Sequence, residues 1–178
     1  MKTATAALLV ATTVACHVWE PVFVSQAGEF SVAFPGKPSY HSHAAEVGAV
    51  ELTRHMFTHS DDRHTYLVQY VDLTIAADMK PDAVLDLSKD NTIRTLATVG
   101  GEILSEERIT REGYPGRDWV LQTPLGAARN RVLLVGARLY TLIVGPQAGR
   151  TIDLATTMDF FDSFRHVPRS TPRAAGST

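Results

Sequence analysis

The sequence predicts a single domain of the α+β class, in which an antiparallel β-sheet is flanked by helices. Its 178 residues suit one domain. A hydrophobic share of 44% with 20% charged residues is a globular composition, which excludes a mainly disordered, collagen-like or coiled-coil chain. Several short runs of alternating apolar residues stand between turn residues, and only two stretches have helical periodicity. Hairpin-linked strands with few helices favour an antiparallel sheet over a doubly wound parallel one.

Four strands are predicted in the first half of the chain. In residues 29–34, Phe and Val alternate with Glu, Ser and Ala, and the prolines of residues 35–38 end that strand. Residues 39–48 are polar and are predicted to form a loop. Apolar residues on both faces of residues 64–73 indicate a central strand that is covered on both sides. The four predicted strands are Trp19–Val24, Glu29–Phe34, Val50–His59 and His64–Leu73.

Two helices are predicted, with further strands between them. The first helix begins near residues 78–82, where a capping residue precedes a proline, and ends at Gly100-Gly101. The closing helix is predicted over residues 153–164. The strands predicted between the helices are Glu102–Thr110, Arg117–Thr123 and Ala128–Val144. The last is long enough for two strands that turn near Gly136-Ala137. Pro115-Gly116 is predicted to be a turn. The buried helix faces are predicted to hold Val84, Leu85, Ile93, Leu96 and Val99 in the first helix, and Leu154, Met158, Phe161 and Phe164 in the second.

Both ends of the chain are predicted to lie outside the folded domain, which we place at residues 17–166. In residues 1–16, Lys2 is followed by an apolar run too short to span a bilayer comfortably, and this pattern is typical of a signal peptide. From Pro168 onwards there is no large apolar residue, and residues 167–178 are predicted to be a disordered tail.

Two cleavage sites are compatible with export. The sequence Thr13-Val14-Ala15-Cys16 resembles a bacterial lipobox, in which the cysteine carries lipid, although the motif prefers Leu where Thr13 stands. Cleavage after Ser25-Gln26-Ala27 is the alternative, but it would remove an apolar segment around Trp19 that resembles part of a folded domain. We therefore expect processing near Cys16, which is a candidate lipidation site, and leave its lipidation open.

The charge balance and the cysteine count exclude several classes of protein. The chain has 17 basic and 19 acidic residues, and three of the basic ones lie outside residues 17–166, so the domain is mildly acidic. This balance argues against a nucleic-acid partner. A single cysteine excludes an intramolecular disulfide framework and a cysteine-based zinc finger.

The seven histidines are the candidate metal ligands of this chain. His41 and His43 would share one side of an extended chain, and so would His55 and His59. His55 and His59 are four residues apart, more than ~13 Å along a strand, so they cannot hold one ion. His59 and His64 would approach each other across a turn that also carries Asp61 and Asp62, but a third fixed ligand is lacking. We therefore predict no metal site.

No catalytic or cofactor-binding residues are predicted either. The sequence has no Gly-x-Ser-x-Gly elbow, P-loop or dinucleotide fingerprint. Glu106 and Glu107 are adjacent on a strand and point to opposite faces, so they cannot act as an acid–base pair. The basic residues Arg117, Arg129, Arg131 and Arg138 would form an anion-binding patch if their strands adjoin, but pairing with Glu102, Glu106 or Asp118 is the favoured interpretation.

Four phrases, in this order, resemble a group of bacterial secreted or lipoprotein domains of unassigned function. They are Gly28–Pro38, Gly113–Asp118, Arg131–Tyr140 and Phe161–Phe164. The order of elements is also similar to the PsbP family of extrinsic photosystem II subunits, whose fold a Ran-binding import factor shares. The resemblance implies an antiparallel sheet flanked by helices, and binding or assembly rather than catalysis. It assigns no functional role to any residue of this chain.

The expected function is therefore that of an exported, non-catalytic binding or assembly module of the cell envelope. Its partner would be a protein or a small ligand, and it would contact the membrane only through a lipid anchor on Cys16. We expect it to be periplasmic, extracellular or lipid-anchored, and to need no cofactor. Two alternatives stay open, a zinc- or copper-binding envelope protein and an enzyme without a recognisable motif.

Overall fold

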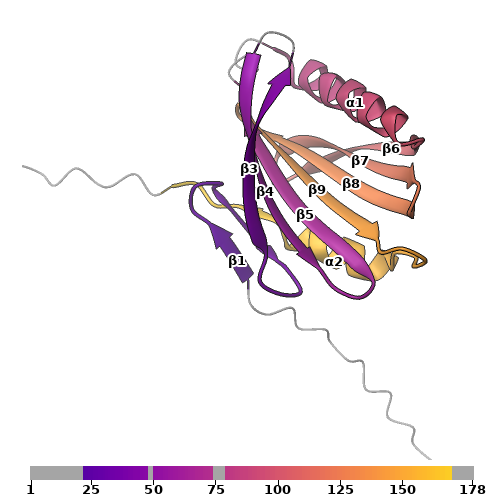
Figure 1. Ribbon diagram of the computed structural model, residues 1–178. Coiled ribbons are helices and arrows are strands. Elements are labelled where there is room, and N and C mark those ends of the chain that lie inside the picture. Colours follow the sequence, from indigo (N-terminus) through magenta and orange to yellow (C-terminus); the bar gives the residue numbers. More distant parts are fainter. Residues whose placement is uncertain (1–21, 48–49, 74–78, 170–178) are drawn as a thin grey trace, which may run out of the picture.

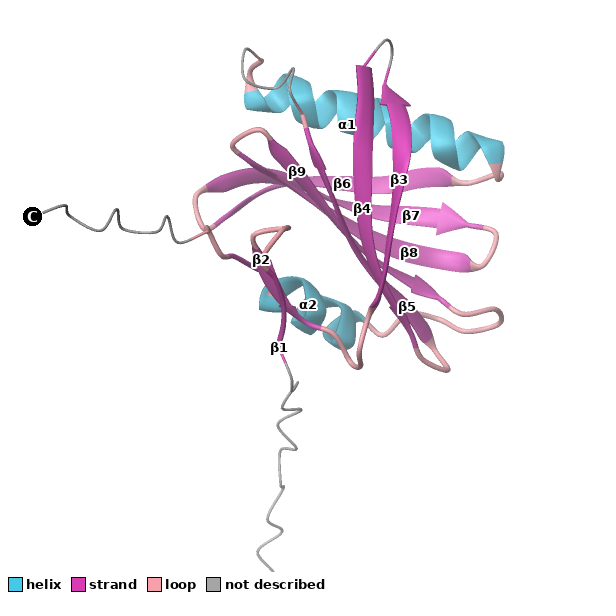
Figure 2. Ribbon diagram, turned by 60° about the vertical axis from the view of Figure 1, so that its left-hand side comes forward, coloured by secondary structure: helices cyan, strands magenta, loops and turns pink. Residues whose placement is uncertain are grey.

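The computed structural model describes residues 22–47, 50–73 and 79–169. They form a large, curved antiparallel sheet with helix α1 on one face, and helix α2 with a small second sheet on the other (Figure 1). Turning the molecule separates the two helices, which lie on opposite sides of the large sheet (Figure 2). The predicted α+β class, the antiparallel sheet and the single compact domain are confirmed. Residues 1–21, including the predicted signal peptide and Cys16, lie outside the described residues.

The elements follow one another mostly as hairpins. The seven-stranded sheet has the order β3-β4-β5-β9-β8-β7-β6, and the small sheet has the order β1-β2-β10. Helix α1 is the connection between β5 and β6, and α2 follows β9. The bounds are β1 Val22–Ser25, β2 Phe30–Ala33, β3 Ser39–Val47, β4 Val50–Ser60, β5 His64–Asp72, α1 Pro81–Thr98, β6 Glu102–Arg111, β7 Tyr114–Thr123, β8 Gly126–Val135, β9 Arg138–Pro146, α2 Leu154–Ser163 and β10 Arg165–His166.

The loop predicted over residues 39–48 is wrong, because residues 39–47 form strand β3. This strand pairs with β4 along its whole length, from Ser39 opposite Thr58 to Val47 opposite Val50. It is an edge strand, and its residue Tyr40 is 51% exposed. A strand with little buried surface does not need apolar alternation, since the ladder of backbone hydrogen bonds holds it.

The turn predicted at Pro115-Gly116 is also wrong. Both residues lie inside β7, and the chain reverses at Glu112 and Gly113, whose φ angles are +52° and +84°. Two consecutive positive φ angles are typical of a tight hairpin turn. Gly116 is needed for a different reason, since a Cβ atom there would lie 2.3 Å from the carbonyl oxygen of Val132 in β8.

The large sheet separates two hydrophobic cores. The core on the α2 side is rich in aromatic rings and includes Phe30, Tyr66, Tyr140 and Phe160. The core on the α1 side is smaller and centres on Leu85, Trp119 and Val132. Strand β5 buries one face in the first core, whereas on its other face only the partly buried Val71 packs against the second, so the coverage predicted for residues 64–73 is complete on one face only.

The buried face of α2 differs from the predicted stripe. Phe161 and Phe164 are buried as predicted, but Leu154 is 53% exposed and Phe160 is fully buried. Asp153 caps the helix by accepting a hydrogen bond from the backbone N–H of Thr156. Leu154 lies in the first turn, before the helix packs against the sheet, which explains why its apolar side chain remains exposed.

A buried arginine connects α2 to the sheet. Arg131 of β8 is 2% exposed, binds both carboxylate oxygens of Asp118 at 2.8 Å, and donates to Asp162 of α2 at 2.9 Å. Its guanidinium also lies 5.0 Å from the centre of the Phe161 ring. This pairing with Asp118 is the one favoured by the sequence over a free anion-binding patch.

Val167 and Arg169 still contact the domain after β10. The backbone N–H of Val167 donates to the carbonyl oxygen of Glu29, and Arg169 pairs with the Glu29 carboxylate. The folded part of the chain therefore extends at least three residues past the expected boundary at residue 166. Residues 170–178, the rest of the predicted tail, lie outside the described residues.

Candidate functional site

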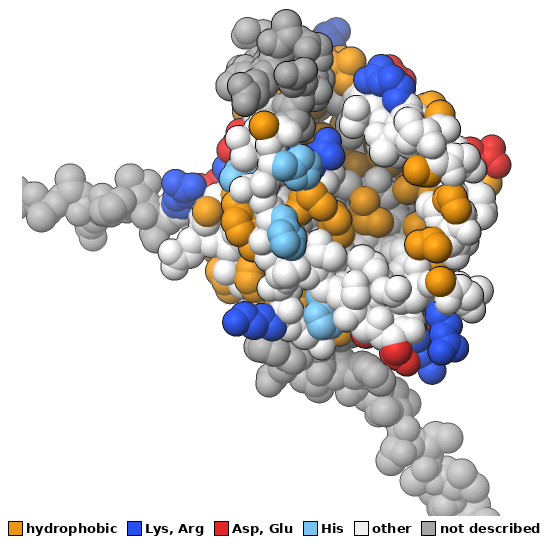
Figure 3. Space-filling model, in the orientation of Figure 1, with side chains coloured by type: hydrophobic (Ala, Val, Ile, Leu, Met, Phe, Trp, Pro, Cys, Tyr) orange, Lys and Arg blue, Asp and Glu red, His pale blue; other side chains and the backbone are white. Residues whose placement is uncertain are grey.

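A cavity of about 280 Å³ lies between α1 and the large sheet. Helix α1 packs on β6, β7 and β8, while β3, β4 and β5 curve away from it on the other side (Figure 1). In the space-filling view, this hollow opens beside α1, and hydrophobic side chains gather inside it (Figure 3). Small-molecule sites usually measure ~300–1,000 Å³, so the cavity is near the lower end of that range.

The roof of the cavity is the middle of α1, where the predicted apolar face is interrupted. Val84, Leu85 and Leu96 are buried as predicted, but Ile93 and Val99 are 45% and 53% exposed. The side that faces the sheet between Leu85 and Leu96 is polar instead. It consists of residues at the spacing of one helix face, namely Ser88, Asn91, Thr92 and Thr95.

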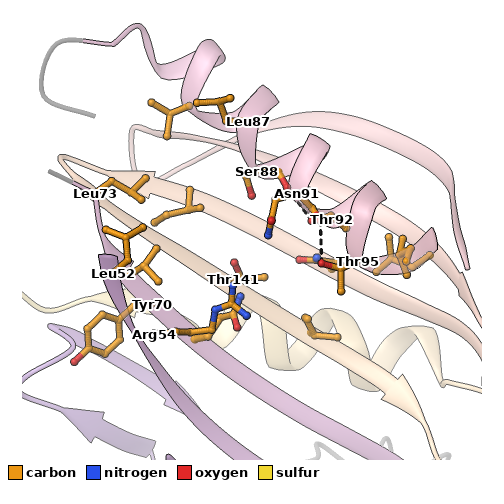
Figure 4. Close-up of a pocket in the computed structure, with 18 of the residues that line it drawn as sticks. Leu52, Arg54, Tyr70, Leu73, Leu87, Ser88, Asn91, Thr92, Thr95 and Thr141 are labelled. Atoms are coloured by element: carbon orange, nitrogen blue, oxygen red, sulfur yellow. Dashed lines mark hydrogen bonds between the residues drawn. The ribbon is translucent and has the colours of Figure 1, made fainter. Parts of the chain in front are cut away.

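The floor is formed by alternate residues of four neighbouring strands. The cavity is lined by Arg54 of β4, Gln69 of β5, Thr141 of β9 and Asn130 of β8. Figure 4 shows Arg54 and Thr141 among them. The register explains this shared face, since Gln69 is opposite Thr141. Tyr70 borders the cavity, but its ring points away and stacks on His55 at 4.5 Å on the other face of the sheet (Figure 4).

Two polar atoms of the floor are buried and lack a hydrogen-bond partner among the described residues. They are Nε of Arg54 and Oδ1 of Asn130. Asn130 as a whole is only 3% exposed. A buried polar group without a partner costs about 1–3 kcal/mol of stability, so native proteins rarely keep one without a reason. These two atoms indicate where a bound molecule would make polar contacts.

One end of the cavity is apolar. Leu52 and Leu73 face Leu87 of α1 at this end, while Arg54, Thr141 and Asn91 lie further along (Figure 4). Leu87 is 44% exposed at the edge of α1. The cavity thus has a hydrophobic part and a polar part with a single charged residue, Arg54, among the described residues that line it.

A buried arginine also holds the helix that forms the roof. Arg117 of β7 is 3% exposed and donates to Asp82 of α1 at 2.8 Å and to Glu106 of β6 at 3.1 Å. The hydrogen bond from Arg117, with the nearby charge of Arg108, lowers the pKa of Asp82 below its usual value. Burial opposes the charged form of Glu106, but the hydrogen bond from Lys89 and the nearby charges of Lys89 and Arg117 outweigh it and lower the pKa of Glu106. Arg117 is thus occupied in fixing α1 and is not available as part of an anion-binding patch.

The histidines considered as metal ligands are scattered. Among the described residues, no group of three or more His, Cys, Asp or Glu side chains is close enough to hold a metal ion. His41 and His43 lie on the edge strand β3, and His55 accepts or donates a hydrogen bond with Tyr40 on the opposite face from the cavity. His64 is buried, contacts the Tyr66 hydroxyl, and accepts a hydrogen bond from the backbone N–H of Asp153.

The architecture can be compared with solved structures. Cyanobacterial PsbP (CyanoP) from Synechocystis sp. PCC 6803 superimposes with a TM-score of 0.60, covering 88% of this chain and 98% of that one. The fold is PsbP-like. The two sequences are only 9% identical, so the likeness concerns the fold alone. No protein-family model matches the chain, and no curated protein sequence matches it.

The PsbP-like fold was expected from the order of elements, whereas the cavity was not predicted. Its polar floor residues come from four strands, and each of them looks like an ordinary solvent-facing residue in the sequence. The sequence feature that could have indicated the cavity is the run of polar residues at helical spacing in α1, which interrupts an otherwise apolar face. In the part of the chain that the structure describes, neither helix has the length and hydrophobicity needed to cross a bilayer.

Proposed function

We propose that this protein is a non-catalytic binding module that holds a small, largely apolar ligand between α1 and the large sheet. The observation that carries the proposal is the cavity itself, because it combines a hydrophobic end with buried polar atoms that have no partner among the described residues. An apolar cavity with a few convergent polar groups is the usual form of a small-molecule site.

The chemistry of the lining supports binding over catalysis. Hydroxyls and amides dominate its polar part, and the charged group is the guanidinium of Arg54, which only donates hydrogen bonds. The Thr92 and Thr95 hydroxyls donate to the backbone of their own helix. No carboxylate, histidine or cysteine lines the cavity among the described residues, so it offers no general base or activated nucleophile.

The binding function is tested by filling the cavity. We expect the uncharged dye phenylnaphthylamine, which fluoresces in apolar surroundings, to bind the wild-type protein saturably with one dye per chain. Asn91→Trp and Thr95→Trp place a large ring on the cavity side of α1 and should weaken dye binding roughly tenfold or more.

Asp90→Trp is the matched control, because Asp90 is exposed on the same helix and does not line the cavity. It should bind the dye like the wild type, and thermal melts should show that all three variants are folded. Equal dye binding by the folded filling variants and the wild type would contradict the proposed site.

We also propose that the module acts at the cell envelope. This rests on the signal-peptide pattern of residues 1–16, on the lipobox-like sequence that ends at Cys16, and on the resemblance to bacterial secreted domains. Intact-mass measurement of the protein from an exporting bacterial host should give a chain that begins at Cys16 or His17. A diacylglyceryl mass increment that Cys16→Ser removes would support a lipid anchor, and a chain that begins at Gly28 would contradict this processing.

A further inference from the structure

We infer that the ligand is a single-chain amphiphile with a carboxylate head, which binds Arg54 while its hydrocarbon chain occupies the apolar end of the cavity. This inference rests on the proposed function and adds the chemical class of the ligand. It follows from the charge at the floor, from the hydrogen-bonding groups around it, and from the size and polarity of the remaining space.

Arg54 differs from the most buried arginines of the same sheet in having no carboxylate partner among the described residues. Arg117, Arg131 and Arg138 are buried or nearly buried, and each contacts at least two carboxylates. Arg54 is partly buried, yet it has no ion pair with any described residue, and its Nε lacks a hydrogen-bond partner there. No acidic side chain lines the cavity among the described residues. A ligand with a negative charge would supply the missing partner, whereas a cationic ligand would be repelled.

The groups around Arg54 suit a carboxylate. A guanidinium presents parallel N–H donors that match the two oxygens of a carboxylate. The Arg54 side chain points toward Thr141, whose hydroxyl can donate to the same head group (Figure 4). The amide of Asn130 is not held in its present orientation by any hydrogen bond to Oδ1 among the described residues, so it can turn its NH₂ group toward an acceptor.

The rest of the cavity suits one hydrocarbon chain. Leu52, Leu73 and Leu87 surround its apolar end, together with Met79 and Leu139. At about 280 Å³ the cavity lies just below the ~300–1,000 Å³ of ordinary small-molecule sites, which suits a ligand with a single medium-length hydrocarbon chain, such as a medium-chain fatty acid.

The inference is tested with a pair of ligands that differ only in the head group. Decanoate and decanol share a ten-carbon chain, and decanoate is ionised near neutral pH. Each is added below its solubility limit to displace phenylnaphthylamine from the full-length protein. We expect decanoate to displace the dye at a roughly tenfold lower concentration than decanol, as for a hydrogen-bonded charge pair in a partly buried site.

Three arginine variants identify the group responsible. Arg54→Met should weaken decanoate binding roughly tenfold and leave decanol binding within about twofold. Arg54→Lys keeps the charge and should retain part of the preference for decanoate. Arg63→Met removes an exposed arginine of the β4–β5 hairpin that does not line the cavity, and it should behave like the wild type.

The outcomes separate this inference from the proposed function. The inferred carboxylate head is refuted if the wild type binds decanol as tightly as decanoate, or if Arg54→Met still prefers decanoate. In that case, dye binding that Asn91→Trp blocks would still support the cavity as a ligand site. If the dye does not bind the wild type, the proposed function fails and this inference fails with it. Unchanged decanol binding shows that the Arg54 variants are folded around an intact cavity.

Discussion

Replacing Phe160 with alanine is expected to lower the free energy of unfolding by about 3–5 kcal/mol, the usual cost of removing a buried phenylalanine. Phe160 is 0% exposed in the core between α2 and the large sheet. Its ring centre lies 5.2 Å from that of Tyr66 in an edge-to-face arrangement and 5.3 Å from that of Phe34. Alanine would lose these contacts and leave a cavity in the aromatic core. This loss is a large part of a typical stability of ~5–15 kcal/mol.

Leu154→Ala is the matched control for Phe160, since it removes an apolar side chain from the same helix at a position that is 53% exposed. Its effect should stay below about 0.5 kcal/mol. Urea unfolding followed by circular dichroism measures both values. A Phe160 variant as stable as the Leu154 variant would mean that α2 does not pack on the sheet as described.

Replacing Arg131 with methionine is expected to lower the free energy of unfolding by about 3–5 kcal/mol, the range found when one partner of a buried ion pair is removed. The Arg131 and Asp118 side chains are only 3% and 16% exposed and make two parallel hydrogen bonds. Without Arg131, the carboxylate of Asp118 would stay largely buried without its countercharge. Methionine fills part of the volume, so the loss reflects the charge more than the packing.

Two further variants test this reason. Arg131→Met combined with Asp118→Leu removes both charges and should recover much of the stability that the single variant loses. Arg111→Met removes an exposed arginine that contacts the same Asp162 and should cost less than about 1 kcal/mol. If the double variant is no more stable than Arg131→Met alone, the cost arises from lost packing and not from an unpaired carboxylate.

Much of the PsbP-like fold was predictable, because strand and helix periodicity are local properties of the chain. The sequence patterns located β2, β4, β5 and β6 to within a few residues, and the favoured pairing of arginines with acidic residues of neighbouring strands occurs for Arg117 with Glu106 and for Arg131 with Asp118. The errors occurred where local pattern and burial differ. Strand β3 lies at an edge and needs no apolar face, and the buried face of α2 includes Phe160 in place of Leu154.

The candidate site depends on distant parts of the chain. Arg54, Gln69, Asn130 and Thr141 lie on four strands, and in the sequence each is an isolated polar residue with no motif around it. The order β4-β5-β9-β8 and its register place them on one face, and α1 covers that face without filling the space above it. The order of residues thus establishes the elements of this protein, since hydrogen bonding and side-chain periodicity act over a few residues. The binding cavity exists only through the tertiary structure, because the gap between a helix and a curved sheet is set by packing between residues far apart in the chain.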